Sequence, residues 1–246
     1  MPSALGKPAP QSGWAVLLYG PPPDLELLAS ELNGSGLAVV QIAGHFFLQA
    51  PEVFDPLSWP EEVGWAGAAI LQQLNGTIRL RYAVRLPLQC GPAVLSDRDG
   101  RFSPDAIERA VAAVRAESPR PFQLSLGEIW TATRNRPHLG RALDLFLLGS
   151  AAWNLRETFE EARRDLGPAA ESWIAAQGWA EECAWFRWTV DGSTPRRPGL
   201  SRHRSRFPQP QNHPTRMHPL AANNFVRRVL EELVRLHLED RHEPLP

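Results

Sequence analysis

The sequence predicts an α+β fold, in which a small mixed α/β domain is followed by an all-helical domain. Short apolar runs bounded by glycine and proline punctuate the first half and favour strands. From Leu139 onwards, apolar residues recur every three or four positions, which indicates amphipathic helices. We therefore expect a flexible lead-in over 1–13, a mixed domain over 14–125 and a helical domain over 139–246.

The first elements are predicted from the positions of glycine and proline and from residue type. A continuous apolar run over 14–19 ends at a glycine and three prolines, which is typical of a buried strand. The pattern over 24–32 predicts a short helix capped by Asp24. Residues 37–50 are β-branched and aromatic, so we expect one strand there, with Gly44 at a bulge.

The middle of the first half carries the clearest alternation in the chain. Residues 60–74 predict a helix that ends at Asn75 and Gly76. From Thr77 to Leu86, apolar positions alternate with arginine, threonine and alanine, which predicts a strand with one buried face.

The mixed domain closes with a turn and a helix. The pair Asp99-Gly100 predicts a hairpin turn, and a Ser-Pro cap opens a helix over 103–117. The boundary between the two domains then falls between residues 118 and 140.

The second half is predicted to be helical throughout, apart from one loop. A first helix carries an apolar stripe of Leu148, Ala152, Leu155, Phe159, Ala162 and Leu166. Gly167-Pro168 ends this helix, further helix follows over 170–184, and a last amphipathic helix spans 220–239. Most of the nine tryptophans are expected in the core, notably Trp153, Trp173, Trp179, Trp185 and Trp188.

The charge balance restricts the classes of function. The formal net charge is −1, which argues against a surface devoted as a whole to nucleic acid or to an anionic membrane. Lys7 is the single lysine among 26 basic residues; arginine suits phosphate, but a GC-rich genome produces the same bias. No signal peptide and no membrane-crossing run is visible, so we expect a cytoplasmic protein without a membrane partner.

Common catalytic and cofactor motifs are absent from the sequence. It contains no phosphate-binding loop, dinucleotide fingerprint, nucleophile elbow or zinc-protease motif. The two cysteines lie far apart, and a frayed helix end explains His237, Asp240 and His242 better than a metal site does. We therefore expect no metal and no cofactor.

One loop, residues 195–219, concentrates positive charge and proline. Its five prolines between 196 and 219 forbid a helix and leave backbone polar groups for water, side chains or a ligand. Guanidinium groups suit phosphates and carboxylates, so the loop is predicted to bind RNA or an acidic protein partner. The candidate anion-binding residues are Arg196, Arg204, Arg206 and Arg216, with Arg197 and Arg202 beside them.

Five residues separate Arg197 from His203, and Arg202 directly precedes the histidine. An arginine followed at this spacing by a histidine in a helical domain resembles the signature of the HEPN superfamily. The resemblance implies a metal-independent ribonuclease of a bacterial toxin or defence type that acts as a homodimer. In it, His203 would be the general acid or base, and Arg197 and Arg202 would neutralise charge on the phosphate.

The end of the chain also resembles a group of uncharacterised bacterial proteins, to which no activity attaches. That ending comprises a Thr-x-Asn turn, a glycine, an Arg-His pair, a proline-rich link, a Pro-Met pair and a last amphipathic helix. The matching residues are Arg202, His203 and Met217, together with the run Leu74-Asn75-Gly76, while Asp191 stands where asparagine is usual.

Three hypotheses follow for the arginine-rich loop. It belongs to a ribonuclease-like domain, it docks on RNA or on an acidic protein without catalysis, or it only fastens the last helix of a bacterial accessory protein. In the third case Arg202 and His203 would pair with acids of the helical domain. Those acids are Glu157, Glu160, Glu161 and Asp165.

Overall fold

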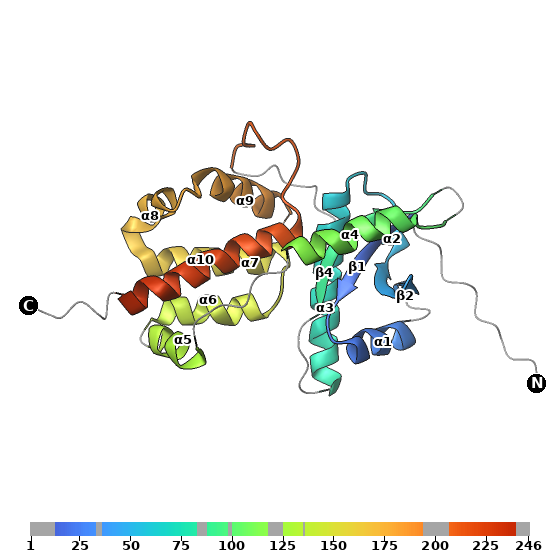
Figure 1. Cartoon of the computed structure of the whole chain (residues 1–246), viewed down its shortest axis with the longest axis horizontal. Coiled ribbons are helices and arrows are strands. Elements are labelled where there is room, and N and C mark those ends of the chain that lie inside the picture. Colours follow the sequence, from blue (N-terminus) through green and yellow to red (C-terminus); the bar gives the residue numbers. More distant parts are fainter. Residues whose placement is uncertain are drawn as a thin grey trace, which may run out of the picture. The chain divides into compact units, whose positions relative to one another are not determined.

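A computed structural model describes residues 13–32, 36–82, 88–97, 100–117, 125–134, 136–193 and 207–239. The chain forms two compact units (Figure 1). Unit 1 comprises Met1–Glu117 with His218–Leu220, and unit 2 comprises Ser118–Met217 with Ala221–Pro246. An antiparallel sheet with helices in unit 1 and helices throughout the described part of unit 2 confirm the α+β prediction.

Unit 1 is built on a four-stranded antiparallel sheet in the order β2-β3-β1-β4. The strands are β1 (Trp14–Tyr19), β2 (Ala38–Ile42), β3 (His45–Gln49) and β4 (Gln89–Leu95). β1 confirms the strand predicted over 14–19. It lies inside the sheet, so its backbone is paired on both edges.

Helices cover both faces of this sheet. They are α1 (Pro22–Glu31), the short α2 (Pro51–Phe54), α3 (Pro60–Tyr82) and α4 (Pro104–Glu117). Val16 and Leu18 of β1 belong to a core cluster shared with α1 and α3. Ala15 and Leu17 belong to a second cluster shared with α4. Burial on both faces is the reason β1 reads as a continuous apolar run.

The single strand expected over 37–50 is wrong, because the chain forms a hairpin there. β2 and β3 pair antiparallel with Ile42 opposite His45. Ala43 and Gly44 between them have φ angles of 49° and 82°, the left-handed conformation of a two-residue hairpin turn. Gly44 therefore supplies a turn rather than a bulge.

The predictions for Asp24 and for the turn at Asp99-Gly100 have different outcomes. Asp24 does not cap α1, which begins after Pro21; it lies buried in the first turn. The chain reverses between Ser96 and Phe102, which form an isolated antiparallel bridge. Asp99 of the predicted hairpin turn lies outside the described residues.

The predicted strand from Thr77 to Leu86 is wrong over Thr77–Tyr82, where α3 continues as a helix. The rest of that stretch lies outside the described residues. Asn75, expected to end the helix, is instead buried within it. Its amide donates to the carbonyl of Leu88 and accepts from the Leu88 amide, both at 2.9 Å. The side chain thus satisfies the backbone that leads into β4, which a turn residue would not do.

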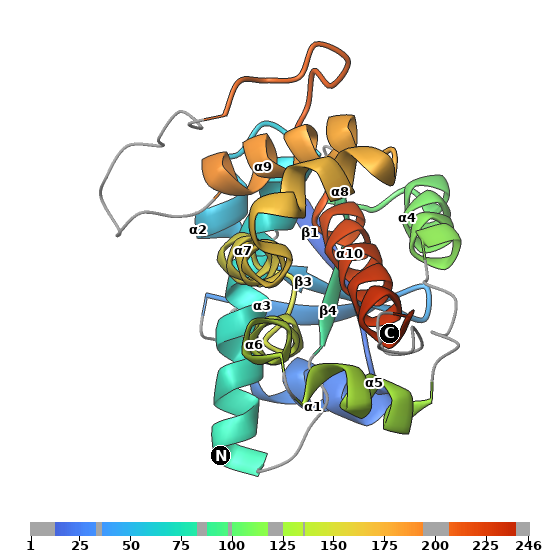
Figure 2. The same ribbon diagram turned by 90° about the vertical axis from the view of Figure 1, so that its left-hand side faces the viewer.

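The secondary-structure elements in the described part of unit 2 are all helices. They are α5 (Leu126–Thr133), α6 (Pro137–Leu147), α7 (Ala152–Leu166), a 3-10 turn (Gly167–Ala169), α8 (Ala170–Ala176), α9 (Ala180–Ser193) and α10 (Pro219–Glu239), of which Ala221 onwards belongs to this unit. The helix expected over 170–184 is divided between α8 and α9 near Gly178, whose φ is 74°. α6 and α7 pack side by side, as Figure 2 shows.

Phenylalanine rather than tryptophan fills the centre of unit 2. Phe159 of α7, Phe186 of α9 and Phe225 of α10 are fully buried, and their ring centroids lie 5.1 to 5.8 Å apart. None of the five tryptophans predicted for this core is fully buried, and Trp153 is 47% exposed. The expectation of a tryptophan-filled core is therefore wrong for this unit.

None of the helices in the described ranges combines the length and the apolar character that crossing a membrane requires. Both cysteines, Cys90 and Cys183, are buried free thiols. Burial raises the pKa of the Cys183 thiol to about 11 and that of Cys90 further still. Neither thiol is therefore suited to act as a nucleophile at neutral pH.

Candidate functional site

Most of the residues predicted for the anion site lie outside the described part of the chain. These are Arg196, Arg197, Arg202, His203, Arg204 and Arg206. Arg216 is described and is half-buried. A Cβ atom added to Gly192 would come within 2.8 Å of its Nη2 atom, so the guanidinium lies directly over the end of α9.

The described end of the loop, from Phe207 to Met217, packs on α9. The ring of His213 stacks on Trp185, with centroids 3.9 Å apart and planes 7° from parallel. Trp185 also donates its indole N–H to the carbonyl of Thr215 at 2.9 Å. The buried Thr189 hydroxyl accepts from the amide of Met217 at 2.9 Å. This part of the loop therefore has an ordered structural role.

The four acids that were candidate partners for Arg202 and His203 have partners among the described residues. Glu160 accepts from Arg163 at 2.9 Å, and Glu157 lies 4.0 Å from Arg156. Asp165 pairs with His237. Glu161 has several partners, which are described below. Each of these carboxylates thus has a partner within the described part of unit 2.

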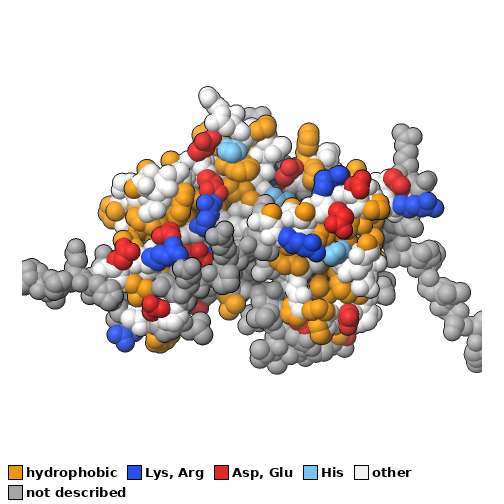
Figure 3. Space-filling view, in the orientation of Figure 1, with side chains coloured by type: hydrophobic (Ala, Val, Ile, Leu, Met, Phe, Trp, Pro, Cys, Tyr) orange, Lys and Arg blue, Asp and Glu red, His pale blue; other side chains and the backbone are white. Residues whose placement is uncertain are grey.

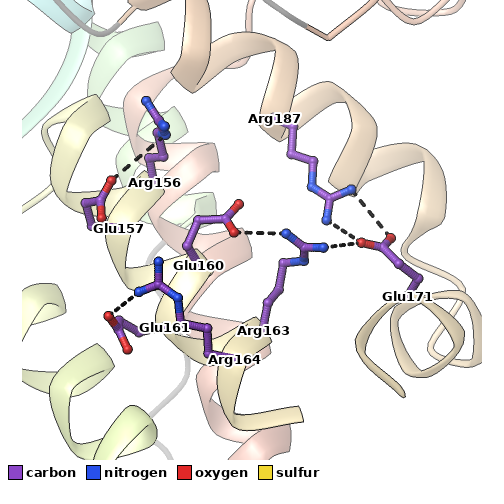
Figure 4. A network of polar contacts seen from close by, with 8 residues as sticks. All are labelled: Arg156, Glu157, Glu160, Glu161, Arg163, Arg164, Glu171 and Arg187. Carbon is purple, nitrogen blue, oxygen red and sulfur yellow. Dashed lines mark hydrogen bonds and ion pairs between the residues drawn. The ribbon is translucent and has the colours of Figure 1, made fainter. Parts of the chain in front are cut away.

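A chain of alternating glutamate and arginine side chains, Glu160, Arg163, Glu171 and Arg187, links α7, α8 and α9 (Figure 4). Arg163 donates to Glu160 and, at 2.6 Å, to Glu171, which also accepts from Arg187 at 2.6 Å. The hydrogen bond from Arg187 is the main cause of the lowered pKa of Glu171. A hollow of about 490 Å³ lies beside this network. Because the arginines of this network are already paired, we interpret the network as a structural link between helices.

A second cluster of polar side chains, on α6 and α7, is better suited to catalytic chemistry. His138 and Glu161 form a dyad, with Nδ1 2.8 Å from Oε2. The side chain of Glu161 is only 7% exposed, whereas that of His138 is 49% exposed. Arg164 lies 2.5 Å and Arg141 3.4 Å from the other carboxylate oxygen.

The surroundings keep Glu161 ionised. The hydrogen bond from His138 is the largest cause of its lowered pKa, and Arg164 lowers it further against the opposing effect of burial. An ionised carboxylate only accepts hydrogen bonds, so Nδ1 of His138 carries a proton. In the neutral imidazole, Nε2 is then the acceptor.

The dyad borders a hollow of about 900 Å³ between α5, α6 and the middle of α7. Its lining residues are Ile129, Trp130, Thr133, Arg134, Arg136, Pro137, His138, Gly140, Arg141, Leu143, Asp144 and Glu161. Trp130 is 68% exposed, the most exposed large apolar side chain among those described. A tryptophan so open to solvent is available to stack on a ligand.

Two of the arginines in this lining are unengaged. The guanidinium groups of Arg134 and Arg136 form no ion pair or hydrogen bond with any residue that the structure describes. Three arginines face two carboxylates in the lining, which leaves an excess of one positive charge before His138 is counted. The hollow therefore favours an anion that also presents a flat ring.

The described residues offer no site with the donor set of a protein metal centre. No three histidine, cysteine, aspartate or glutamate side chains converge among them. His237 turns to Asp165, and its sequence neighbours Asp240 and His242 lie outside the described range.

Sequence reasoning missed this hollow because it took the stretch around 118–140 as a domain boundary. Two local signals mark helices there. Ser125 and Glu128 form a reciprocal capping box at the start of α5, and Pro137 occupies the first position of α6. Both patterns are readable from the sequence, but the meeting of Trp130, His138 and Glu161 is not.

Comparison with known proteins finds no matching family model, no significantly similar curated protein and no significantly similar solved structure.

Proposed function

We propose that the protein binds single-stranded RNA in the hollow between α5, α6 and α7. The observation that carries this proposal is the exposed ring of Trp130 beside the unengaged guanidinium groups of Arg134 and Arg136. Proteins that hold single strands combine aromatic stacking platforms with cations that follow the phosphate backbone.

The arrangement favours an unpaired base over a base within a duplex. Stacking on Trp130 needs a free ring face, which a base inside a double helix does not present. The volume of about 900 Å³ lies at the upper end of the range for small-molecule sites, so a nucleotide with its flanking phosphates has room.

The cations of the arginine-rich loop extend this proposal. Arg196, Arg197, Arg202, Arg204 and Arg206 are proposed to contact phosphates further along the strand. Arg216 is a weaker candidate, because its guanidinium lies over Gly192 at the end of α9. An acidic protein surface would attract the same arginines but would make no use of the ring of Trp130.

The test substitutes Trp130 by alanine and measures the affinity for a fluorescently labelled 12-nucleotide oligouridine by anisotropy. Loss of one stacked base costs about 1–3 kcal/mol, so we expect the Kd to rise by about 5- to 150-fold. A duplex RNA of the same length should bind more weakly to the wild type.

Trp153→Ala is the matched control, since Trp153 is also exposed on unit 2 but lies outside the lining of the hollow. It should leave the Kd unchanged. An unaltered Kd in Trp130→Ala, or binding of an acidic peptide in place of RNA, would contradict the proposal.

A further inference from the structure

The His138–Glu161 dyad gives the hollow a group that can move a proton as well as bind. Nδ1 of His138 is held 2.8 Å from the buried Glu161 carboxylate. This contact fixes the tautomer and the ring orientation, which is the role of the third group in a nucleophile, base and orienter arrangement. Nε2 forms no hydrogen bond with any side chain or backbone group of the described ranges.

Two arginines, one in α6 and one at its N-cap, line the hollow together with His138. Arg141 stands three residues after His138 on α6, so the two side chains share a face of the helix. Arg136 is the N-cap residue of the same helix, two residues before His138. All three residues line the hollow, which puts a base and two cations around one ligand position.

We propose that His138 is the general base of a metal-independent RNA cleavage, with Arg136 and Arg141 neutralising charge on the phosphate. As far as the natural substrate is concerned, this inference rests on the RNA binding proposed above. It assigns the chemistry to a histidine other than His203, the candidate drawn from the sequence.

The step is an intramolecular phosphoryl transfer. Nε2 of His138 removes the proton of a ribose 2′-hydroxyl, and the 2′-oxygen forms a bond to the adjacent phosphorus. The bond from phosphorus to the 5′-oxygen breaks, and this oxygen takes a proton from water. The products are a strand ending in a 2′,3′-cyclic phosphate and a strand with a free 5′-hydroxyl.

The first test uses 2-hydroxypropyl p-nitrophenyl phosphate, which undergoes the same transfer but carries no base to stack. The full-length wild type in excess EDTA should release p-nitrophenolate. His138→Gln, whose amide can still donate to Glu161 but cannot take up a proton, should lower the rate by about 100-fold or more. His45→Ala, on β3 of unit 1, and His203→Ala should retain the wild-type rate.

A second readout separates a catalytic histidine from a structural one. Imidazole added to His138→Ala should restore part of the lost rate, because it can supply the missing base in solution. A structural role for the side chain predicts no such rescue. Full activity in His138→Gln, or loss of activity confined to His203→Ala, would overturn the inference.

RNA assays distinguish failure of this inference from failure of the proposed function. Binding of oligouridine without cleavage, together with no turnover of the small phosphodiester, leaves RNA binding standing and overturns the role of His138. Turnover of the small ester that depends on His138, without any binding of RNA, supports His138 as the general base and contradicts RNA as the substrate. Replacing every ribose by 2′-deoxyribose should preserve binding and abolish cleavage.

Discussion

At the scale of single residues, buried polar side chains do the most specific work in this protein. Glu161 collects His138, Arg141 and Arg164 around one carboxylate. Because its pKa is lowered, this carboxylate stays charged when the pH falls to the ordinary pKa of a glutamate side chain. The contribution of the carboxylate to stability is therefore present above that value and is lost only in stronger acid.

His218 carries a basic side chain, whereas Glu161 carries a buried acidic one. Its Nδ1 accepts from the amide of Leu220 at 3.2 Å and so caps the start of α10. Its Nε2 is buried without a hydrogen-bond partner among the described residues, 3.2 Å from the position a Cβ would take on Gly64. Burial lowers the pKa of the imidazole from 6.5 to about 4.

This shift predicts acid sensitivity in unit 1. Below pH 6.5 the unfolded chain binds a proton at His218 that the folded chain rejects, so stability falls as the pH decreases towards 4. Between pH 7 and pH 5 the loss should be about 2 kcal/mol. Hydrogen exchange of peptides from β1 and α3, measured at both pH values, reports it directly.

His218→Asn is the control for this prediction. Asparagine can still cap α10 but does not titrate, so the loss between pH 7 and pH 5 should shrink by about 2 kcal/mol. An equal loss in both proteins would show that other groups cause the acid sensitivity.

At the scale of elements, a helix replaces the strand that the local pattern predicts in one place. The alternation from Thr77 onwards is that of a strand, yet α3 continues to Tyr82. α3 packs closely on β1 at Gly67, where an added Cβ atom would lie 2.9 Å from the side chain of Val16. Each residue added to a helix that is already formed gains a backbone hydrogen bond, and this gain outweighs strand propensity, which is worth less than about 1 kcal/mol per residue.

The bridge between Asn75 and Leu88 is predicted to hold this arrangement together. Asn75→Ala leaves a buried amide and a buried carbonyl without partners, at about 1–3 kcal/mol each. We expect the free energy of unfolding of unit 1 to fall by about 2–6 kcal/mol in urea titrations. Thr77→Ala, an exposed change on the same helix, should stay within about 0.5 kcal/mol of the wild type.

At the scale of the whole molecule, charge is mixed rather than segregated. The net charge is −1, and acidic and basic side chains are interspersed on the face shown in Figure 3. Such a surface does not attract nucleic acid as a whole. Binding of RNA must then depend on a few local cations.

Because binding depends on a few cations, we expect the affinity for RNA to vary only weakly with salt concentration, and we expect mutation of those cations to reduce this variation. Each phosphate contact to a single strand contributes about 0.7 to the slope of log Kd against log salt concentration. The double variant Arg134→Gln with Arg136→Gln should reduce that slope by about 1.4 in anisotropy titrations. Arg109→Gln with Arg115→Gln on α4, both exposed, should not change it.

The sequence by itself determined the elements whose signals are local. The apolar run of β1, the glycine and proline after α7 and the apolar stripe of α10 each predict their element from neighbouring residues. Of the six residues in the predicted apolar stripe, four are buried in α7, namely Ala152, Leu155, Phe159 and Ala162. Leu148 lies before the helix and is 41% exposed, and Leu166 is half-buried.

Only the tertiary structure decided the candidate site. Trp130, His138 and Glu161 come from three helices, and 23 residues separate the histidine from the glutamate. Their meeting depends on how α5, α6 and α7 pack, which is set by the fit of many apolar side chains and not by any local pattern. The sequence drew attention to the arginines of the loop because they are adjacent in the chain, whereas a site is made by residues that are adjacent in space.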